Sequence, residues 1–216
     1  MIPPLFEDAD VLAVNKPEGL ASIPERDTTQ ENLLSLLSAA RPTKLYVVHR
    51  LDKEVSGVIL FAKNAAAHTF LNAQFSHHTV RKTYRAVVHG VMAQESGTID
   101  VPLRQFGSGR MGVDSKRGKE SVTFFHVLTR FVAHTLVEVH PFTGRRHQIR
   151  VHLYSLGHTI VGDPLYGERA MQYPFPRLML HAQKIEVRLP SGNEVMIEAP
   201  VPESFAKALR NLPQGF

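Results

Sequence analysis

Short apolar runs, each bounded by polar residues, glycine or proline, recur along the whole chain. Their length is typical of buried strands rather than helices, and several alternate between apolar and polar positions. The final two runs flank residues 190–193, whose sequence Pro-Ser-Gly-Asn favours a hairpin turn. The predicted strands are residues 11–14, 47–48, 58–61, 83–88, 121–128, 134–139, 184–189 and 194–197.

Apolar residues at helical spacing predict four further segments as helices. Thr28 and Glu31 have capping-box spacing ahead of the first, and Gly157 is a C-cap for the third. In the second, Phe70, Leu71 and Phe75 are expected to face the core. The predicted helices are a leucine-rich segment that ends near Pro42, a segment that follows Asn64, residues 143–156 and residues 203–212.

Strands outnumber helices in this pattern, and most connections are too short for βαβ crossovers. We therefore expect an α+β fold, with a largely antiparallel mixed β-sheet and a few packed helices. The sequence has no internal repeat, low-complexity linker or break in composition. One domain spanning residues 1–216 is the resulting prediction.

The composition limits the possible functions. Lysine and arginine number 25 against 20 acids, which gives a net charge of +5 and a pI near 9.6. This balance fits a polyanionic partner such as nucleic acid, or simply solubility. The absence of cysteine excludes disulfides, thiol catalysis and thiolate metal sites. Neither a signal peptide nor an apolar run of membrane-spanning length is present, so we expect a soluble, cytoplasmic protein.

Residues 107–112 match the glycine pattern of dinucleotide-binding loops, but their context does not. That pattern requires a helix to open directly after it, and the residues that follow have no helical periodicity. A hairpin loop is the better interpretation. Its cations could contact a phosphate backbone or could simply be solvated; they are Arg104, Arg110, Lys116, Arg117 and Lys119.

Asp52 lies on a short loop between two predicted core strands. Arg50 precedes it by two positions and Lys53 follows it directly. A carboxylate fixed between buried strands is well placed for chemistry. The alternative is a solvated turn whose charges pair at the surface.

A second polar cluster occupies residues 143–152, at the start of a predicted helix. Backbone amides at a helix N-terminus, together with Arg145 and Arg146, would suit a phosphate. Neighbouring apolar residues draw Arg150 toward the core, where Asp52 is a candidate partner for it. A merely basic helix is the alternative. A metal site is not expected, because His147 and His152 lie about 140° apart around a helix.

Residues 49–57 and 143–152 resemble the two signature motifs of the RluA-type pseudouridine synthases. Three shorter segments are similar to further motifs of that family and occur in the family's order. One departure is Val55, where the family usually has threonine. The three shorter segments are residues 16–19, 82–84 and 180–182.

The resemblance implies the pseudouridine synthase fold and an enzyme that isomerises uridine in RNA. It identifies Asp52 as the nucleophile, attacking either C1′ of the ribose or C6 of the uracil. It gives Arg150 the role of countering the carboxylate charge, and Tyr84 those of stacking on the uracil and taking up the C5 proton. The residues predicted to contact the substrate are His49, Arg50, Arg145, His147 and Leu180.

The resemblance implies no metal and no organic cofactor. Many relatives carry an N-terminal RNA-binding module of the S4 type, which we do not expect here. The expected partner is structured RNA, a stem-loop of ribosomal or transfer RNA, bound by a monomer that needs no protein partner. A glycosidase would need a second carboxylate, and Asp52 is the one acid among the positions that match these motifs. The remaining alternative is a non-catalytic RNA-binding domain of the same fold.

Overall fold

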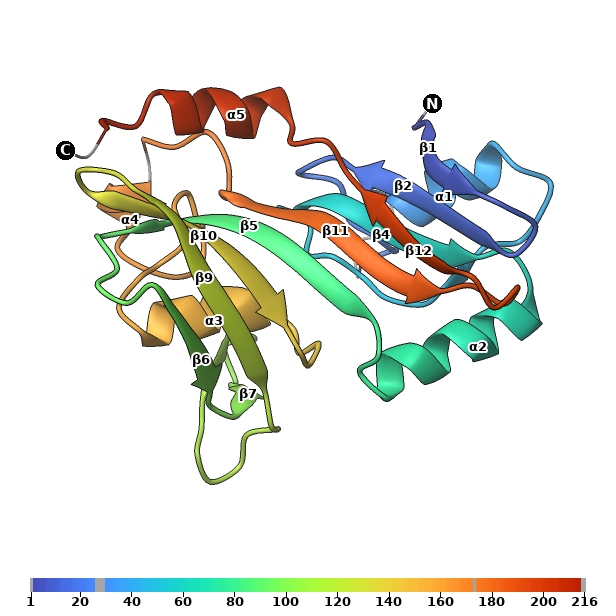
Figure 1. Ribbon diagram of the computed structural model, residues 1–216, viewed down its shortest axis with the longest axis horizontal. Helices are drawn as coiled ribbons and strands as arrows, with labels where there is room; N and C mark the ends of the chain where they lie inside the picture. Colours follow the sequence, from blue (N-terminus) through green and yellow to red (C-terminus); the bar gives the residue numbers. More distant parts are fainter. Residues whose placement is uncertain (1, 26–29, 173, 215–216) are drawn as a thin grey trace. The chain divides into compact units, whose positions relative to one another are not determined.

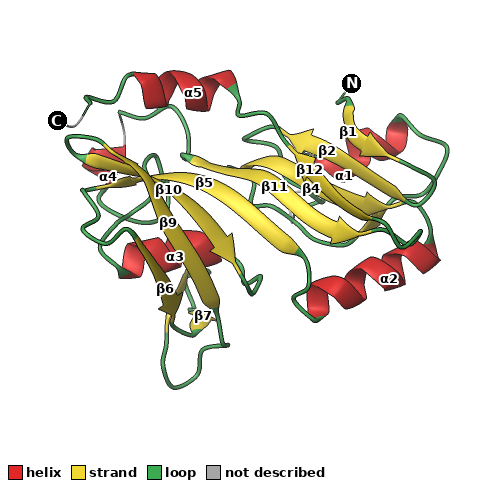
Figure 2. Ribbon diagram, viewed as in Figure 1, coloured by secondary structure: helices red, strands yellow, loops and turns green. Residues whose placement is uncertain are grey.

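The structure, a computed structural model, describes residues 2–25, 30–172 and 174–214. Strands dominate it, with few helices (Figure 2), which confirms the predicted α+β fold. Backbone contacts divide the chain into two compact units. The first unit comprises Met1–Lys82 and Ala182–Val201, and the second comprises Thr83–His181 and Pro202–Phe216. One domain over the whole chain stays a prediction. Within the described residues, no helix is long and apolar enough to cross a membrane.

In the first unit the strand order is β1-β2-β4-β11, with β3 beside β4 and β12 beside β11. The pairings β1–β2, β2–β4, β3–β4 and β11–β12 are antiparallel. The elements are β1 (Pro4–Glu7), β2 (Val11–Lys16), α1 (Leu33–Ala39), β3 (Tyr46–Val47), β4 (Ser56–Ala62), α2 (Ala65–Ser76), β12 (Glu194–Glu198) and most of β11 (Leu180–Arg188).

The core of the first unit forms where β2, β4 and β11 pack with α2. Every residue of β4 is buried, as its continuous apolar sequence predicts. On α2, which Figure 1 shows alongside these strands, Leu71 is fully buried and Phe75 packs partly against the core. The expectation that Phe70 also faces the core is wrong, since its side chain is 36% exposed. Phe70 lies about 100° around the helix from Leu71.

The caps of the helices in the first unit agree only partly with the sequence prediction. Asn64 caps α2 as expected, and its side-chain oxygen accepts a hydrogen bond from the Ala67 amide at 2.8 Å. Asn32 caps α1 in the same way, through the Ser35 amide at 3.0 Å. The predicted capping residue Thr28 lies outside the described residues.

In the second unit the strand order is β5-β10-β9-β6, and each neighbouring pair is antiparallel. β7 and β8 form a separate hairpin, so the glycine pattern at residues 107–112 covers its turn and the start of β8 and does not precede a helix. The elements are most of β5 (Arg81–His89), β6 (Ser96–Asp100), β7 (Leu103–Gln105), β8 (Met111–Val113), β9 (Val122–Arg130), β10 (His134–Pro141), α3 (Gln148–Ser155), α4 (Arg169–Gln172) and α5 (Glu203–Arg210).

Helix α3 crosses behind β9 and β10 (Figure 1) and is shorter than predicted. It begins at Gln148, because the Gln148 side chain holds residues 143–147 in a turn. The carboxamide oxygen of Gln148 accepts hydrogen bonds from the Thr143 hydroxyl at 2.7 Å and from the Arg145 amide at 2.9 Å. The predicted helix start at residue 143 is therefore wrong. Gly157, with φ of 81°, follows the helix as predicted.

Candidate active site

The loop that carries Asp52 is anchored on its N-terminal side by Ser22. The Ser22 hydroxyl donates to the Leu51 carbonyl at 2.8 Å and accepts from the Leu51 amide at 3.1 Å. Ser22 and Leu51 are both buried. The Val55 amide closes the loop by donating to the Asp52 carbonyl at 3.1 Å, and Asp52 itself is half-buried.

A buried lysine anchors the same loop on its C-terminal side. The Lys16 ammonium donates to the carbonyls of Pro17 at 2.9 Å, Leu20 at 2.7 Å and Lys53 at 3.0 Å. Lys16 is fully buried, so these three carbonyls replace the water that its charge would otherwise hold. The sequence analysis quoted Lys16 only as part of a motif and missed this role.

His49 serves the packing of the first unit. Its Nε2 accepts a hydrogen bond from the Leu60 amide at 2.9 Å, and its ring stacks on Phe75 with centroids 4.8 Å apart. Burial, and secondarily the charge of Lys82, lowers the pKa of His49 to about 3. The imidazole is therefore neutral near pH 7 and offers no positive charge to a phosphate. Arg50, the next residue, is exposed.

Gly57 fixes the start of β4 against β11. Its φ is +125°, and a Cβ added there would meet the Ala182 carbonyl oxygen at 2.1 Å. No other residue type fits this approach, which explains why glycine ends the Asp52 loop. Val55 is buried within the same loop, where the resembling family has threonine.

In the second unit, Arg150 and Asp163 form a buried ion pair that the sequence analysis did not anticipate. Their side chains are 1% and 0% exposed. Nε and one terminal nitrogen of Arg150 each donate to a different carboxylate oxygen of Asp163, both at 2.7 Å. Oδ1 of Asp163 also accepts from the amides of Leu165 at 2.9 Å and Tyr166 at 3.1 Å. The predicted Arg150–Asp52 pairing joins residues of the two units and stays a prediction.

Tyr166 connects this ion pair to the start of α3. Its hydroxyl lies 2.9 Å from Nδ1 of His147 and accepts a hydrogen bond from the Met111 amide at 3.2 Å. The guanidinium of Arg150 lies 5.3 Å from the centre of the Tyr166 ring. His147 itself has a left-handed backbone, with φ of 53°, directly before α3. A strained residue held by its side chain in this way is a feature of functional sites.

The other candidates of the second unit lie on two strands and in the turn before α3. Tyr84 is half-buried on β5, opposite Val139 of β10. Leu180 is buried at the start of β11. The half-buried Arg145 donates through Nε to the Glu120 carbonyl at 3.0 Å, so its backbone and side chain are both anchored.

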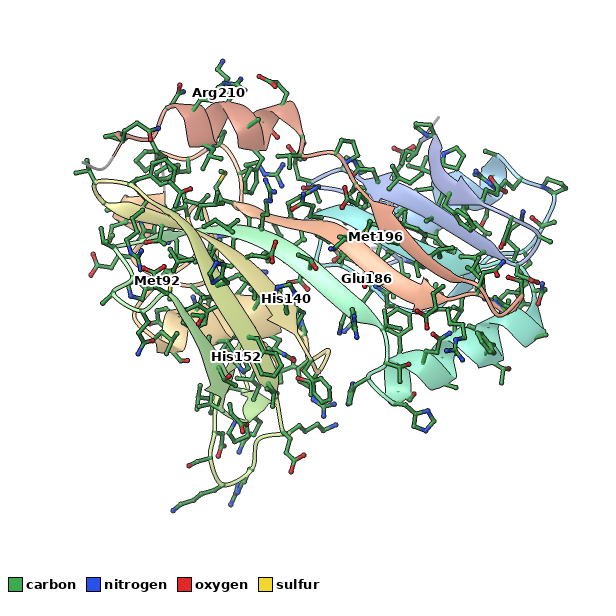
Figure 3. All side chains as sticks on the ribbon, viewed as in Figure 1. Met92, His140, His152, Glu186, Met196 and Arg210 are labelled. Atoms are coloured by element: carbon green, nitrogen blue, oxygen red, sulfur yellow. The ribbon has the colours of Figure 1, made fainter. Side chains whose placement is uncertain are left out.

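His152, labelled in Figure 3, is part of the packing between α3 and its neighbours. Its ring nitrogens lie 2.9 Å from the Thr123 hydroxyl and 3.1 Å from the Val101 carbonyl. Burial lowers the pKa of His152, although the hydrogen bond to Val101 and the charge of Asp100 act in the opposite direction. Over the described part of the chain, no group of three or more His, Asp or Glu side chains is arranged to hold a metal ion.

Comparison with known proteins gives a consistent result. The sequence profile of a family described as RNA pseudouridylate synthase matches residues 10–155. A Bacillus subtilis protein named uncharacterized RNA pseudouridine synthase YlyB is 41% identical over 96% of this chain and 71% of its own length. Ribosomal large subunit pseudouridine synthase D of Pseudomonas aeruginosa is 38% identical over 97% and 71%, respectively. The structure of human RNA pseudouridylate synthase domain containing 1 superimposes with a TM-score of 0.80 at 28% identity, covering 100% of this chain and 97% of that one.

Proposed function

The chain belongs to the RNA pseudouridylate synthase family, and from that premise we propose that it isomerises a uridine of structured RNA with Asp52 as the nucleophile. The relatives are named as RNA pseudouridine synthases, which are isomerases. The observation that carries the proposal is the anchored loop: Ser22 and Lys16 fix both sides of a half-buried carboxylate within the family's signature motif.

The reaction breaks the bond between C1′ of the ribose and N1 of the uracil and forms a bond between C1′ and C5. The proton on C5 leaves, and N1 gains one, so no atom is gained or lost overall. Asp52 begins the reaction by attack on C1′ or on C6. Both routes require an ionised carboxylate at a fixed position, which is what an anchored loop supplies.

Tyr84, Arg150 and Leu180 complete the proposed catalytic machinery. Tyr84 stacks on the uracil and takes up the C5 proton, while Leu180 packs against the base from the other side. Arg150 counters the charge of Asp52, and its own orientation is fixed by the two hydrogen bonds to Asp163. We propose that the two compact units act together as one catalytic domain.

The uridine must leave its stack to be reached, at a cost of a few kcal/mol. The exposed Arg50 beside the Asp52 loop enters the space that the base vacates. His49 belongs to the first signature motif, and Arg145 and His147 belong to the second. All three contribute to substrate binding. His49 does so as a neutral group that fixes the backbone, since its pKa is lowered to about 3.

The proposed substrate is a stem-loop of ribosomal or transfer RNA, bound by a cytoplasmic monomer. The net charge of +5 supports a polyanionic partner. The name of the Pseudomonas aeruginosa relative specifies the large ribosomal subunit, so ribosomal RNA is the first candidate substrate to test.

Release of tritium tests the proposal directly, because isomerisation expels the hydrogen on C5. Unmodified ribosomal and transfer RNA transcripts carrying [5-³H]uridine are incubated with the protein. We expect tritium release from one or a few positions by the wild type and none by Asp52→Asn. RNA binding without release by the wild type would indicate a non-catalytic RNA-binding domain instead.

A further inference from the structure

A cleft of about 390 Å³ opens in the second unit between β8 and α3. Arg110, Met111 and Val113 line it from the hairpin side, and Tyr154 lines it from α3. Tyr166 forms part of its wall. The volume is in the range of small-ligand sites, which is about 300–1,000 Å³.

The side chains of the cleft combine an open aromatic ring with a cation. Tyr154 is 49% exposed, although it is a large aromatic residue on a helix. Its ring lies 6.0 Å from that of Tyr166, at an angle of 42°. The guanidinium of Arg110 lies 5.5 Å from the centre of the Tyr166 ring. Among the described residues that line the cleft, none is acidic. The site thus suits a flat, electron-rich group that carries negative charge.

We propose that this cleft binds a nucleotide of the substrate RNA other than the isomerised uridine, with its base stacked on Tyr154 and its phosphate held by Arg110. The inference rests on the proposed function, since it identifies the ligand as RNA. Bases stack on exposed aromatic side chains whatever their sequence, and arginine adds both charge and cation–π attraction.

The surroundings of the cleft favour RNA over a small anionic ligand. Lys116, Arg117 and Lys119 are exposed on the segment that follows β8. An extended polyanion can contact these cations while one of its bases enters the cleft, whereas Arg110 is the one cation among the described residues that line the cleft itself. Tyr166 contributes to the cleft wall and also contacts Arg150 and His147. The cleft is therefore a binding site next to the proposed machinery and not part of the chemistry.

Base-dependent binding of single-stranded RNA provides the test. Fluorescein-labelled oligo(A) decamers, and a matched decamer with abasic sites, are titrated at constant salt and followed by fluorescence anisotropy. Stacking on one aromatic side chain contributes about 1–3 kcal/mol, so Tyr154→Ala should weaken oligo(A) binding about 5- to 150-fold. Tyr154→Phe, which keeps the ring, should bind within about twofold of the wild type. The abasic decamer should bind wild type and Tyr154→Ala equally.

Phe124→Ala is the matched control, because Phe124 belongs to the same unit, is 43% exposed and does not line the cleft. It should leave oligo(A) affinity unchanged. Val113→Glu places a carboxylate at the exposed rim while Tyr154 remains in place, and it should also weaken binding. This second variant keeps the test valid if thermal unfolding shows that Tyr154→Ala is misfolded.

Equal oligo(A) affinity of wild type, Tyr154→Ala and Val113→Glu would overturn the inference. An equal loss of oligo(A) and abasic binding in Tyr154→Ala would overturn it too, because stacking requires the base. With either of these binding results, tritium release by the wild type would still support the proposed function. Base-dependent binding through Tyr154 in a protein that releases no tritium would support the cleft and refute the proposed function.

Discussion

Asp163→Asn tests how much the buried ion pair contributes to stability. The substitution removes one charge and keeps the size and one acceptor oxygen, so the amides of Leu165 and Tyr166 can retain their partner. The guanidinium of Arg150 then stays in the interior and loses the negative charge of Asp163. Both side chains are at most 1% exposed, so water cannot replace the lost carboxylate.

Breaking a buried, hydrogen-bonded pair by removing one partner costs about 3–5 kcal/mol. That is a large part of the total stability of a typical domain, about 5–15 kcal/mol. For a chain of this length, the same change lowers the melting temperature by about 6–20 °C, taking 2–4 °C per kcal/mol. Because the two charges depend on each other, Arg150→Met combined with Asp163→Asn should lose less than the sum of the single variants.

Urea unfolding followed by far-ultraviolet circular dichroism measures the loss. Glu95→Gln is the control, because it breaks the Arg130–Glu95 pair of the same unit, which is equally short at 2.7 Å but exposed. That substitution should cost less than about 1 kcal/mol. Equal shifts of the urea midpoint for Asp163→Asn and Glu95→Gln would refute the reasoning that burial makes the first pair costly to break.

Three further predictions concern the Asp52 loop and the basic segment that follows β8. Lys16→Met removes the buried ammonium that three backbone carbonyls share and should lower both kcat and the urea midpoint; unchanged values would mean that Lys16 does not hold the Asp52 loop. The His49 pKa is lowered from 6.5 to about 3, so only the unfolded state gains a proton between these values, and stability falls as pH decreases from 6.5. His49→Gln should flatten that decrease by at most about 1.4 kcal/mol per pH unit, and parallel curves in urea titrations would contradict the assignment. Lys116→Ala with Arg117→Ala should reduce the slope of log RNA affinity against log salt by about 1.4, whereas an unchanged slope would identify a merely solvated loop.

The sheet strands could be predicted because burial acts on them locally. In β4 every position is buried, so the apolar run 58–61 is sufficient evidence. In β9 buried and exposed positions alternate, but the apolar residues Phe124 and Leu128 are exposed and the polar Thr123 is buried, so residue type alone predicts the strand and not its buried face. Phe70 shows the limit of the same reasoning on a helix. Its apolar side chain lies next to the buried face of α2 without belonging to it. Residue type alone does not distinguish a buried position on the helix from an exposed position beside it.

The Asp52 loop could be located from the sequence, but its supports could not. Ser22 and Lys16 reach it from 29 and 37 positions away in the chain, and their hydrogen bonds to backbone carbonyls leave no pattern in the sequence. The start of α3 was misplaced for a similar reason. The Gln148 side chain accepts hydrogen bonds from the Thr143 hydroxyl and the Arg145 amide and so keeps these residues out of the helix. Helix propensities do not include a side-chain interaction of this kind.

Asp163 was missed although the sequence contains a usable signal. It follows the apolar residues Ile160 and Val161 after one glycine and precedes Pro164, which indicates an acid in a buried turn. A buried arginine needs a counter-charge, and the sequence analysis looked for it only at Asp52. The presence of Asp163 changes the interpretation of Arg150. Two hydrogen bonds to Asp163 set its orientation within the second unit.

The role of Asp52 as the nucleophile is the central claim, and pseudouridine mapping in cells tests it most directly. Total RNA is compared from cells that lack the gene and from the same cells expressing either the wild type or Asp52→Asn at equal levels. We predict that one or a few pseudouridines are missing without the gene, return with the wild type and stay missing with Asp52→Asn, which still binds RNA. Return of the same pseudouridines with Asp52→Asn would contradict the account.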